Sequence, residues 1–298
     1  MEYTPVAVKM ILDEYRLKLA GKYELTEVMK FVCLLFEEWK GWNKATVHLN
    51  REMELTGEEG EKFRIALRQL EEYRPIQYII GTVQFLDAKI RVREGVLIPR
   101  PETEELAGMI LRDYHHRKNE ILSLLDIGTG TGCIPVAVKK EMPQWTISAM
   151  DISGIALKLA RENSRLNNSS VDYIQADILD RQSWESFPGY TIIISNPPYV
   201  RKSEIPGMLP NVLEYEPHEA LFVTDEDPLQ FFTAIARFSF LHLVRPGTLY
   251  LEINEQDGSR MRELLLESGF DSAEVLKDIR GKDRFARAEL RTALPGPG

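Results

Sequence analysis

Four consecutive residues, Asn196-Pro197-Pro198-Tyr199, have the groups needed to hold a planar NH₂ group. The Asn196 side-chain oxygen and the Pro197 backbone carbonyl can each accept one hydrogen of such a group. Proline fixes φ and so presets the direction of that carbonyl, and Tyr199 offers a flat apolar wall. We predict catalytic roles for Asn196, Pro197 and Tyr199, and substrate contacts for all four residues including Pro198. The alternative is an ordinary Asn-Pro turn that ends a strand.

A glycine-rich stretch provides a second candidate site. Gly128-Thr129-Gly130-Thr131-Gly132 leaves the apolar run Leu124–Ile127 and enters a helical pattern. Glycines permit a tight turn and let a ligand approach the backbone, and a helix N-terminus favours a carboxylate or phosphate. The pattern predicts that Gly128, Thr129, Gly130, Thr131 and Gly132 contact a nucleotide-like cofactor.

The details of this loop narrow the choice of cofactor. A dinucleotide fingerprint needs a third glycine where Cys133 stands, and the loop lacks the lysine of a P-loop. An NAD-type fold with a degenerate third glycine stays open as an alternative.

Acidic residues follow the next two predicted strands. Asp151 ends the second strand, where a carboxylate can accept hydrogen bonds from both hydroxyls of a ribose. Asp177 ends the third strand and is placed to meet an adenine amino group, with Ile178 stacking against the ring. The Asp before the loop, the loop itself and these two acids resemble class I methyltransferases that bind S-adenosylmethionine.

In that context the Asn-Pro-Pro-Tyr turn would act on a nitrogen atom. A planar nitrogen is a poor nucleophile because its lone pair is delocalised, and two fixed acceptors would hold that lone pair toward a sulfonium methyl. Ligands of open α/β sheets bind beyond the carboxyl ends of the strands, where the tetrapeptide falls. Catalysis would then rest on positioning and electrostatic preorganisation, with no obligatory general base.

Residues up to about Tyr73 show helical periodicity, which predicts a small helical bundle. The run Val8–Tyr15 indicates an early helix, and Thr56 is placed to cap a later one that ends before Pro75. Between them Thr26 is the predicted N-cap of a helix with an apolar ladder. That ladder comprises Val28, Phe31, Val32, Leu35, Phe36 and Trp39.

Strand-like alternation follows from Ile76 to Ile98, with turns at Gly81 and Gly95. We interpret this stretch as a β-hairpin that links two domains. The predicted organisation is a helical substrate-recognition domain over 1–74, a hairpin linker over 75–99 and a methyltransferase domain over 100–298.

From Leu124 onward, short apolar runs alternate with helical patterns. This rhythm is typical of an α/β fold with a mostly parallel sheet covered on both faces. Strands are predicted at 124–127, 146–150, 171–175, 191–195 and 248–253, and helices at 134–140, 156–167, 229–243 and 259–268. Residues 273–276 and 285–290 are expected to form a closing antiparallel pair, and the tail 294–298 to be frayed.

Composition and charge exclude some classes of function. The 298 residues carry a formal net charge of -9, with 44% hydrophobic and 28% charged residues, which is ordinary for a globular chain. Residues 1–75 hold 12 basic and 14 acidic groups, and the remainder hold 25 and 32. Neither part has the basic surplus of a protein held by the DNA backbone. Cys33 and Cys133 have no metal-ligand spacing, so we expect no metal.

Targeting signals are not visible in the sequence. The start lacks the basic and apolar regions of a signal peptide, and the longest apolar runs are too short to span a bilayer. We therefore expect a cytoplasmic protein that does not contact a membrane.

Several motifs occur together along nearly the whole chain. These motifs include the helical domain, the glycine-rich loop and Asn-Pro-Pro-Tyr. The others are Pro75–Gly81, Ile98–Glu104 and Tyr215-Glu216-Pro217. This combination resembles the HemK-type family of protein-(glutamine-N5) methyltransferases of peptide-chain release factors. The resemblance implies a class I, Rossmann-like fold with a mostly parallel seven-stranded sheet, S-adenosylmethionine as the methyl donor, and a monomer. The implied substrate is the glutamine of the release-factor Gly-Gly-Gln motif.

Two other functions remain as alternatives. An adenine-N6 methyltransferase of nucleic acid shares Asn-Pro-Pro-Tyr, but it needs base flipping and a basic groove, which the acidic charge disfavours. We accordingly expect no direct DNA binding. An inactive release-factor adaptor would not require an intact Asn196 and glycine-rich loop.

Polar residues near the predicted site are candidates for supporting roles. Glu252 and Asn254 end the fifth predicted strand, and Arg100 precedes the acidic run Glu102-Thr103-Glu104. We expect the first two to support the site. The others either support it or form a salt-bridged helix start.

Overall fold

The computed structural model describes residues 4–291 of the chain, and the tail predicted to be frayed lies outside them. Backbone contacts divide the chain into two compact units. One unit comprises the described residues up to Gly81 together with Leu209–Tyr215, and the other comprises Thr82–Met208 and the described residues from Glu216. The predicted linker 75–99 is thus divided between the two units.

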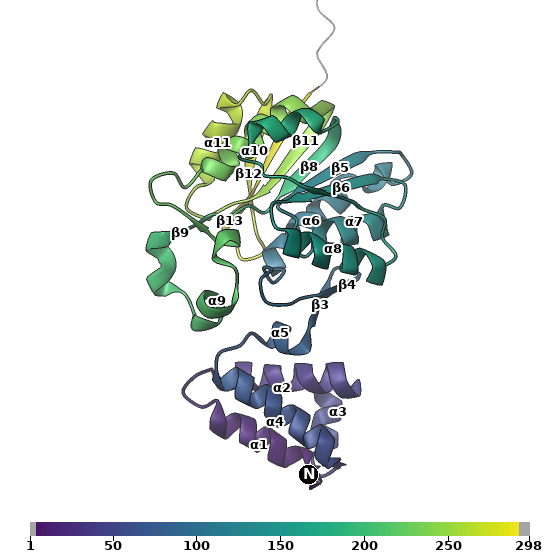
Figure 1. Ribbon diagram of the computed structural model, residues 1–298, viewed down its shortest axis with the longest axis vertical. Helices are drawn as coiled ribbons and strands as arrows, with labels where there is room; N and C mark the ends of the chain where they lie inside the picture. Colours follow the sequence, from purple (N-terminus) through teal and green to yellow (C-terminus); the bar gives the residue numbers. More distant parts are fainter. Residues whose placement is uncertain (1–3, 292–298) are drawn as a thin grey trace, which may run out of the picture. The chain divides into compact units, whose positions relative to one another are not determined.

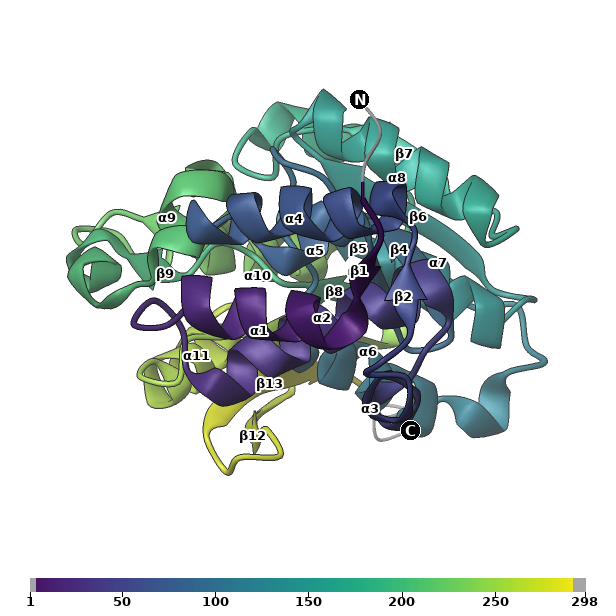
Figure 2. The same cartoon turned by 90° about the horizontal axis from the view of Figure 1, so that it is seen from below.

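The first unit is the small helical bundle that periodicity predicts. It contains α1 (Val8–Lys18), α2 (Leu25–Lys40), α3 (Lys44–Leu49), α4 (Gly57–Glu71), α5 (Ile76–Ile80), α9 (Pro210–Tyr215) and the short antiparallel pair β1 (Val6–Ala7) and β2 (Glu54–Leu55). Helix α1 packs against α2 and α4 (Figure 2). The apolar ladder of α2 is buried as expected from Val28 to Phe36. Within this core the Tyr15 hydroxyl donates to the Phe63 carbonyl at 2.7 Å.

Of the two predicted helix caps, one is confirmed and one is wrong. Thr56 caps α4 in a reciprocal capping box, because its side chain accepts from Glu59 N while the Glu59 carboxylate accepts from Thr56 N. Thr26 does not cap α2. The helix begins earlier, at Leu25, and the extended residue Glu24 is its N-cap, so Thr26 lies inside the first turn.

The strand predicted from Ile76 is also wrong in its first part. Residues Ile76–Ile80 form helix α5, in which the amides of Tyr78 and Ile79 donate to the Pro75 carbonyl, and Gly81 ends it at φ +83°. The hairpin itself is present and consists of β3 (Thr82–Phe85) and β4 (Ala88–Arg91). Alternating apolar residues over five positions fit a helical turn as well as a strand, so the pattern could not distinguish them.

The second unit is built on a seven-stranded, mostly parallel sheet, which confirms the predicted α/β class (Figure 1). Its order is β12-β13-β11-β8-β5-β6-β7, and β13 alone runs antiparallel to both of its neighbours. The strands are β5 (Ser123–Ile127), β6 (Thr146–Asp151), β7 (Asp172–Gln175), β8 (Tyr190–Ser195), β11 (Leu243–Glu252), β12 (Ser272–Lys277) and β13 (Asp283–Leu290). The closing pair β12 and β13 was also predicted.

Helices cover both faces of this sheet (Figure 1). One layer contains α6 (Pro101–Asp113), α7 (Cys133–Glu141) and α8 (Gly154–Leu166), and the other contains α10 (Gln230–His242) and α11 (Gly258–Glu267). Under α10 and α11 lies a hydrophobic core in which Phe232, Ile235 and Phe238 pack with apolar strand residues. This double cover explains why the strands read as continuous apolar runs.

Helix α6 follows Arg100, so the helix start offered as one interpretation of residues 100–104 is present. A parallel pair that was not predicted, β9 (Val200–Arg201) with β10 (Phe222–Val223), follows the Asn-Pro-Pro-Tyr turn. Within residues 4–291, no helix is both long enough and apolar enough to cross a bilayer.

Candidate active site

The glycine-rich loop connects β5 to α7 in a backbone conformation that needs glycine. Gly128, Gly130 and Gly132 have φ values of +74°, +53° and +75°, in the left-handed region that disfavours side chains. The amides of Gly128 and Thr129 both donate to the Met150 carbonyl at the end of β6. The loop is therefore fixed to the neighbouring strand by its backbone. Thr131, the remaining predicted contact, is buried.

Two of these glycines serve different purposes. A Cβ atom on Gly128 would meet nothing within 4 Å, so that position leaves room for a ligand. A Cβ atom on Gly132 would lie 2.9 Å from both the Ala160 Cβ and the Tyr173 hydroxyl oxygen. The glycine at 132 is thus required for the close packing of α7 against α8 and β7.

We expect Gly132→Ala to lower the free energy of unfolding by about 2–4 kcal/mol, because a left-handed backbone cost adds to overpacking. Gly281→Ala is the matched control, since Gly281 has φ +81° and open space around it. It should cost only the backbone contribution of about 1–2 kcal/mol. Urea unfolding of both variants measures the difference, and equal losses would contradict the packing role of Gly132.

Asp151 is the last residue of β6, as predicted, and its carboxylate braces the loop. Oδ2 accepts from Gly130 N and Oδ1 from Ser153 N, each at 2.8 Å. Burial raises the pKa of Asp151, and these amide hydrogen bonds oppose the shift. Each carboxylate oxygen can accept a further hydrogen bond, so the residue could still bind two hydroxyl groups.

Asp177 and Ile178 lie beyond β7, which ends at Gln175, so Asp177 does not end the third strand. The Asp177 Oδ1 accepts from Leu179 N at 2.9 Å, within its own turn. Ile178 is buried in the core beside Trp184, whose indole nitrogen donates to the Ile178 carbonyl at 3.1 Å. Both side chains thus have structural roles, and their contacts with adenine stay predictions.

The Asn-Pro-Pro-Tyr turn begins where β8 ends. Ser195, the last residue of β8, donates through Oγ to the Ile127 carbonyl at 2.7 Å. This contact joins the start of the turn to the residue that precedes Gly128. The two predicted sites therefore lie at the same carboxyl edge of the sheet, β8 beside β5. Pro197 is buried, whereas Pro198 and Tyr199 are half-buried.

A chain of hydrogen bonds holds both ends of the turn. Asn196 Nδ2 donates to Thr103 Oγ1 at 2.9 Å, and Thr103 donates to Glu252 Oε2 at 2.6 Å. The Tyr199 hydroxyl donates to the other Glu252 oxygen at 2.9 Å. Among the described residues, neither Asn196 Oδ1 nor the Pro197 carbonyl has a hydrogen-bond partner. Two acceptors therefore stand unused in the turn.

Glu252 is the centre of this chain and is only 1% exposed. Burial raises its pKa to about 7, while hydrogen bonds from Thr103 and Tyr199 act in the opposite direction. The supporting role expected for Glu252 is consistent with this position at the end of β11. In the sequence, Glu252 stood out as one acidic residue in an otherwise apolar strand. Nothing in the sequence indicated that Thr103 links Glu252 to Asn196.

Two ion pairs with buried carboxylates stabilise the loops around the turn, and neither was predicted from the sequence. Arg201 donates to both carboxylate oxygens of Asp257, at 2.7 and 2.6 Å. Glu216 accepts from Ile98 N at 3.1 Å and from the Arg100 guanidinium at 2.6 Å. The partners within each set are at least 56 residues apart, so no local spacing could have indicated them.

Asp126 is the penultimate residue of β5, one residue before Ile127 and the loop, and is fully buried. Neither of its carboxylate oxygens has a hydrogen-bond partner, and the same is true of the nearby Thr129 hydroxyl. Burial raises the pKa of Asp126 to about 7, and the Asp151 carboxylate raises it further, while the Thr129 hydroxyl lies close enough to lower it. An unpaired buried carboxylate beneath a ligand loop needs a donor or a positive charge to balance it.

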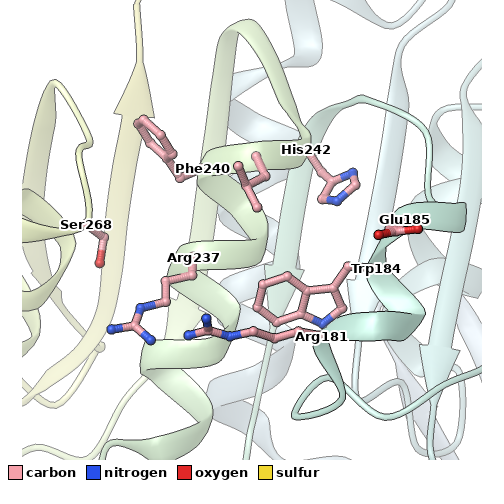
Figure 3. Close-up of a pocket in the computed structure, with 8 residues that line it drawn as sticks. Arg181, Trp184, Glu185, Arg237, Phe240, His242 and Ser268 are labelled. Carbon is pink, nitrogen blue, oxygen red and sulfur yellow. The ribbon is translucent and has the colours of Figure 1, made fainter.

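A surface hollow of about 460 Å³ lies elsewhere in the second unit, between α10 and the segment after β7 (Figure 3). Arg181, Trp184 and Arg237 are among its lining residues, and none of the predicted site residues lines it.

The described residues contain no group of three or more His, Cys, Asp or Glu side chains that could hold a metal ion. The absence of a metal stays a prediction.

The sheet order and the loops at the carboxyl ends of β5, β6 and β8 are those of a Rossmann-like methyltransferase. A solved structure of a methyltransferase from Pyrococcus furiosus has a TM-score of 0.51 at 17% identity, covering 70% of this chain and 91% of that one. This similarity concerns the fold alone. A family model described as the methyltransferase small domain matches residues 110–214, and one described as the PrmC N-terminal domain matches residues 12–81.

Closer relatives define the family. The chain is 37% identical over 289 residues to a release factor glutamine methyltransferase of Flavobacterium psychrophilum, covering 95% of this chain and 100% of that protein. It is also 37% identical over 274 residues to one of Bacteroides thetaiotaomicron, covering 92% and 96%. The chain belongs to the release factor glutamine methyltransferase family, as its motifs predicted.

Proposed function

We propose that this protein transfers a methyl group from S-adenosylmethionine to the side-chain amide nitrogen of the glutamine in the release-factor Gly-Gly-Gln motif. The observation that carries the proposal is the pair of unused acceptors in the turn, Asn196 Oδ1 and the Pro197 carbonyl. Two acceptors match the two hydrogens of a primary amide. Family membership supplies the substrate class.

The residues around the glycine-rich loop fit S-adenosylmethionine. Gly128 leaves space for a ligand against the backbone, and Asp151 keeps acceptor capacity for two ribose hydroxyls. The unpaired Asp126 carboxylate favours a ligand that carries positive charge. When bound, this cofactor supplies an electrophilic methyl group on a sulfonium. We assign Gly128, Thr129, Gly130, Thr131, Gly132, Asp151, Asp177 and Ile178 to its site.

The reaction would be catalysed by orientation. Asn196 Oδ1 and the Pro197 carbonyl accept the two amide hydrogens, and the Tyr199 ring lies against the planar group. The nitrogen lone pair would thereby face the methyl carbon that S-adenosylmethionine would supply, so that the new N–C bond could form as the C–S bond electrons return to sulfur. One N–H proton is then lost to water. Fixed acceptors supply positioning and preorganised electrostatics, and no general base is required.

The remaining assignments follow from the family and from charge. We assign substrate recognition to the helical domain, which matches the PrmC N-terminal domain. A release-factor substrate supports a cytoplasmic location, because release factors act on ribosomes. The family resemblance implies a monomer, and we expect no contact with a membrane because the longest apolar runs are too short to span one. The net charge of -9 opposes binding to DNA, a polyanion.

One experiment separates this proposal from its alternatives. The purified protein is incubated with radiolabelled S-adenosylmethionine and, in parallel, with a release factor, with a release factor whose motif glutamine is replaced by alanine, and with DNA. We expect label only on the release factor with the intact glutamine. Label on DNA alone would identify an adenine methyltransferase. Label on neither, with the release factor still bound, would identify an inactive adaptor.

A further inference from the structure

We propose that Thr103 and Glu252 orient the Asn196 carboxamide so that its oxygen, and not its nitrogen, faces the substrate amide. Both are positioning residues, because Thr103 acts through Asn196 and Glu252 acts through Thr103. The inference rests on the proposed function, in which Asn196 accepts a hydrogen bond from the glutamine NH₂ group.

The orientation matters because the two ends of a carboxamide have similar shapes and opposite hydrogen-bonding roles. With Oδ1 toward the substrate, Asn196 accepts one amide hydrogen. With Nδ2 toward the substrate, two NH₂ groups would face each other and neither could accept. An unrestrained asparagine could adopt either state by a half-turn of its terminal torsion, which has broad, two-fold preferences.

The hydrogen-bond chain selects one of these states. An ionised Glu252 carboxylate can only accept, so the Thr103 hydroxyl at 2.6 Å must donate its single hydrogen there. Thr103 Oγ1 then has only lone pairs left for Asn196, which must supply Nδ2 at 2.9 Å. The Asn196 oxygen is thereby turned away from Thr103. The direction of each bond follows from the charge on Glu252.

Burial strengthens this selection. Thr103 is 4% exposed and Glu252 is 1% exposed, so water does not compete for their hydrogen-bonding groups. The three residues come from different parts of the chain: Thr103 from the start of α6, Glu252 from the end of β11 and Asn196 from the turn after β8. In addition, the Tyr199 hydroxyl donates to the second Glu252 oxygen at 2.9 Å, which fixes the carboxylate.

The charge on Glu252 makes the selection dependent on pH. Burial raises the pKa of Glu252 to about 7. The Glu102 carboxylate of α6 raises it further, and Arg284 of β13, Thr103 and Tyr199 lower it. Below that pKa the protonated carboxyl can donate to Thr103, and Thr103 can then donate to a reversed Asn196. We expect kcat to fall as pH decreases through about 7, and this fall to be smaller in Glu252→Gln, measured with saturating substrates.

Thr103→Val tests the relay directly, because valine keeps the β-branched shape and removes the hydroxyl. We expect kcat for the release factor to fall about tenfold, less than the loss on removing a preorganised contact outright. The dissociation constant for S-adenosylhomocysteine should not change. Thr103→Ser restores the hydroxyl and should restore kcat. Thr233→Val makes the same chemical change on α10, which contributes no residue to this hydrogen-bond chain, and should have no effect.

A double-mutant cycle distinguishes orientation from general structural support. If Thr103 acts through Asn196, adding Thr103→Val to Asn196→Ala should cause no further loss of kcat. If Thr103 had only a structural role, the double variant would lose kcat by the product of the two single-variant factors. A second readout needs no catalysis: the side-chain NH₂ signal of ¹⁵N-labelled Asn196 should exchange slowly with water in the unmodified protein and quickly in Thr103→Val.

The outcomes separate this inference from the proposed function. Unchanged kcat in Thr103→Val, multiplied losses in the cycle, or unchanged exchange of the Asn196 signal would each overturn the orienting role. Failure of the unmodified protein to methylate a release factor would instead contradict the proposed function. In that case the exchange of the Asn196 signal still decides whether Thr103 holds its nitrogen.

Discussion

Replacing Asn196 by alanine is expected to lower kcat by on the order of 10²–10³ while leaving S-adenosylmethionine binding unchanged. The variant removes Oδ1, one of the two acceptors proposed to hold the glutamine amide, but touches no residue of the glycine-rich loop. The loss corresponds to about 3–4 kcal/mol of transition-state stabilisation, as found when one preorganised hydrogen-bonding group is removed. Single-turnover methylation of a release factor measures the chemical step, and calorimetry measures cofactor affinity.

The control for this variant is Asn119→Ala, which removes an exposed asparagine far along the chain from the turn. It should have normal kcat. Asn196→Asp provides a second comparison. It keeps an acceptor but places a negative charge beside Thr103, whose Oγ1 lies 2.6 Å from the Glu252 carboxylate. Near-normal turnover in Asn196→Ala would remove the basis for the catalytic role of the turn.

The sheet could be predicted from the sequence because its strands are short, apolar and separated by glycine and polar residues. Thr191–Ser195, for example, corresponds to β8 within one residue. Residues 76–80 were wrongly predicted as strand, because the alternation of Ile76, Tyr78 and Ile80 fits a short helix as well as a strand. The start of helix α6 was offered as one of two interpretations of residues 100–104, but its extent to Asp113 was not predicted. The irregular segment after the turn has no periodicity from which elements could be assigned.

The site was predictable where its residues follow a strand directly. Gly128, Asp151 and Asn196 each lie at the carboxyl end of a strand, so the parallel sheet brings them to one edge. Their partners were not predictable. Thr103 and Asn196 are 93 residues apart, and Thr103 and Glu252 are 149 apart. Their contact depends on β11 lying beside β8, and sequence periodicity does not encode that order.

Asp151→Ala is expected to weaken S-adenosylmethionine binding by on the order of 100-fold, equivalent to about 3 kcal/mol. The carboxylate is proposed to accept hydrogen bonds from both ribose hydroxyls, and bonds to a charged group contribute about 1.5–3 kcal/mol each. Calorimetric titration measures the dissociation constant. At saturating cofactor, KM for the release factor should stay near its normal value. Asp172→Ala removes an exposed carboxylate from the adjacent strand β7 and should bind the cofactor normally.

Asp151 also braces the loop, so a second measurement must separate ribose contact from loop support. The carboxylate accepts from Gly130 N and Ser153 N, and alanine would release both amides. Binding of S-adenosylhomocysteine is therefore compared with binding of its 2′,3′-dideoxy analogue. If Asp151 contacts the ribose, loss of the hydroxyls weakens binding to the unmodified protein but has little further effect in Asp151→Ala. An equal penalty in both proteins would assign Asp151 to loop support alone.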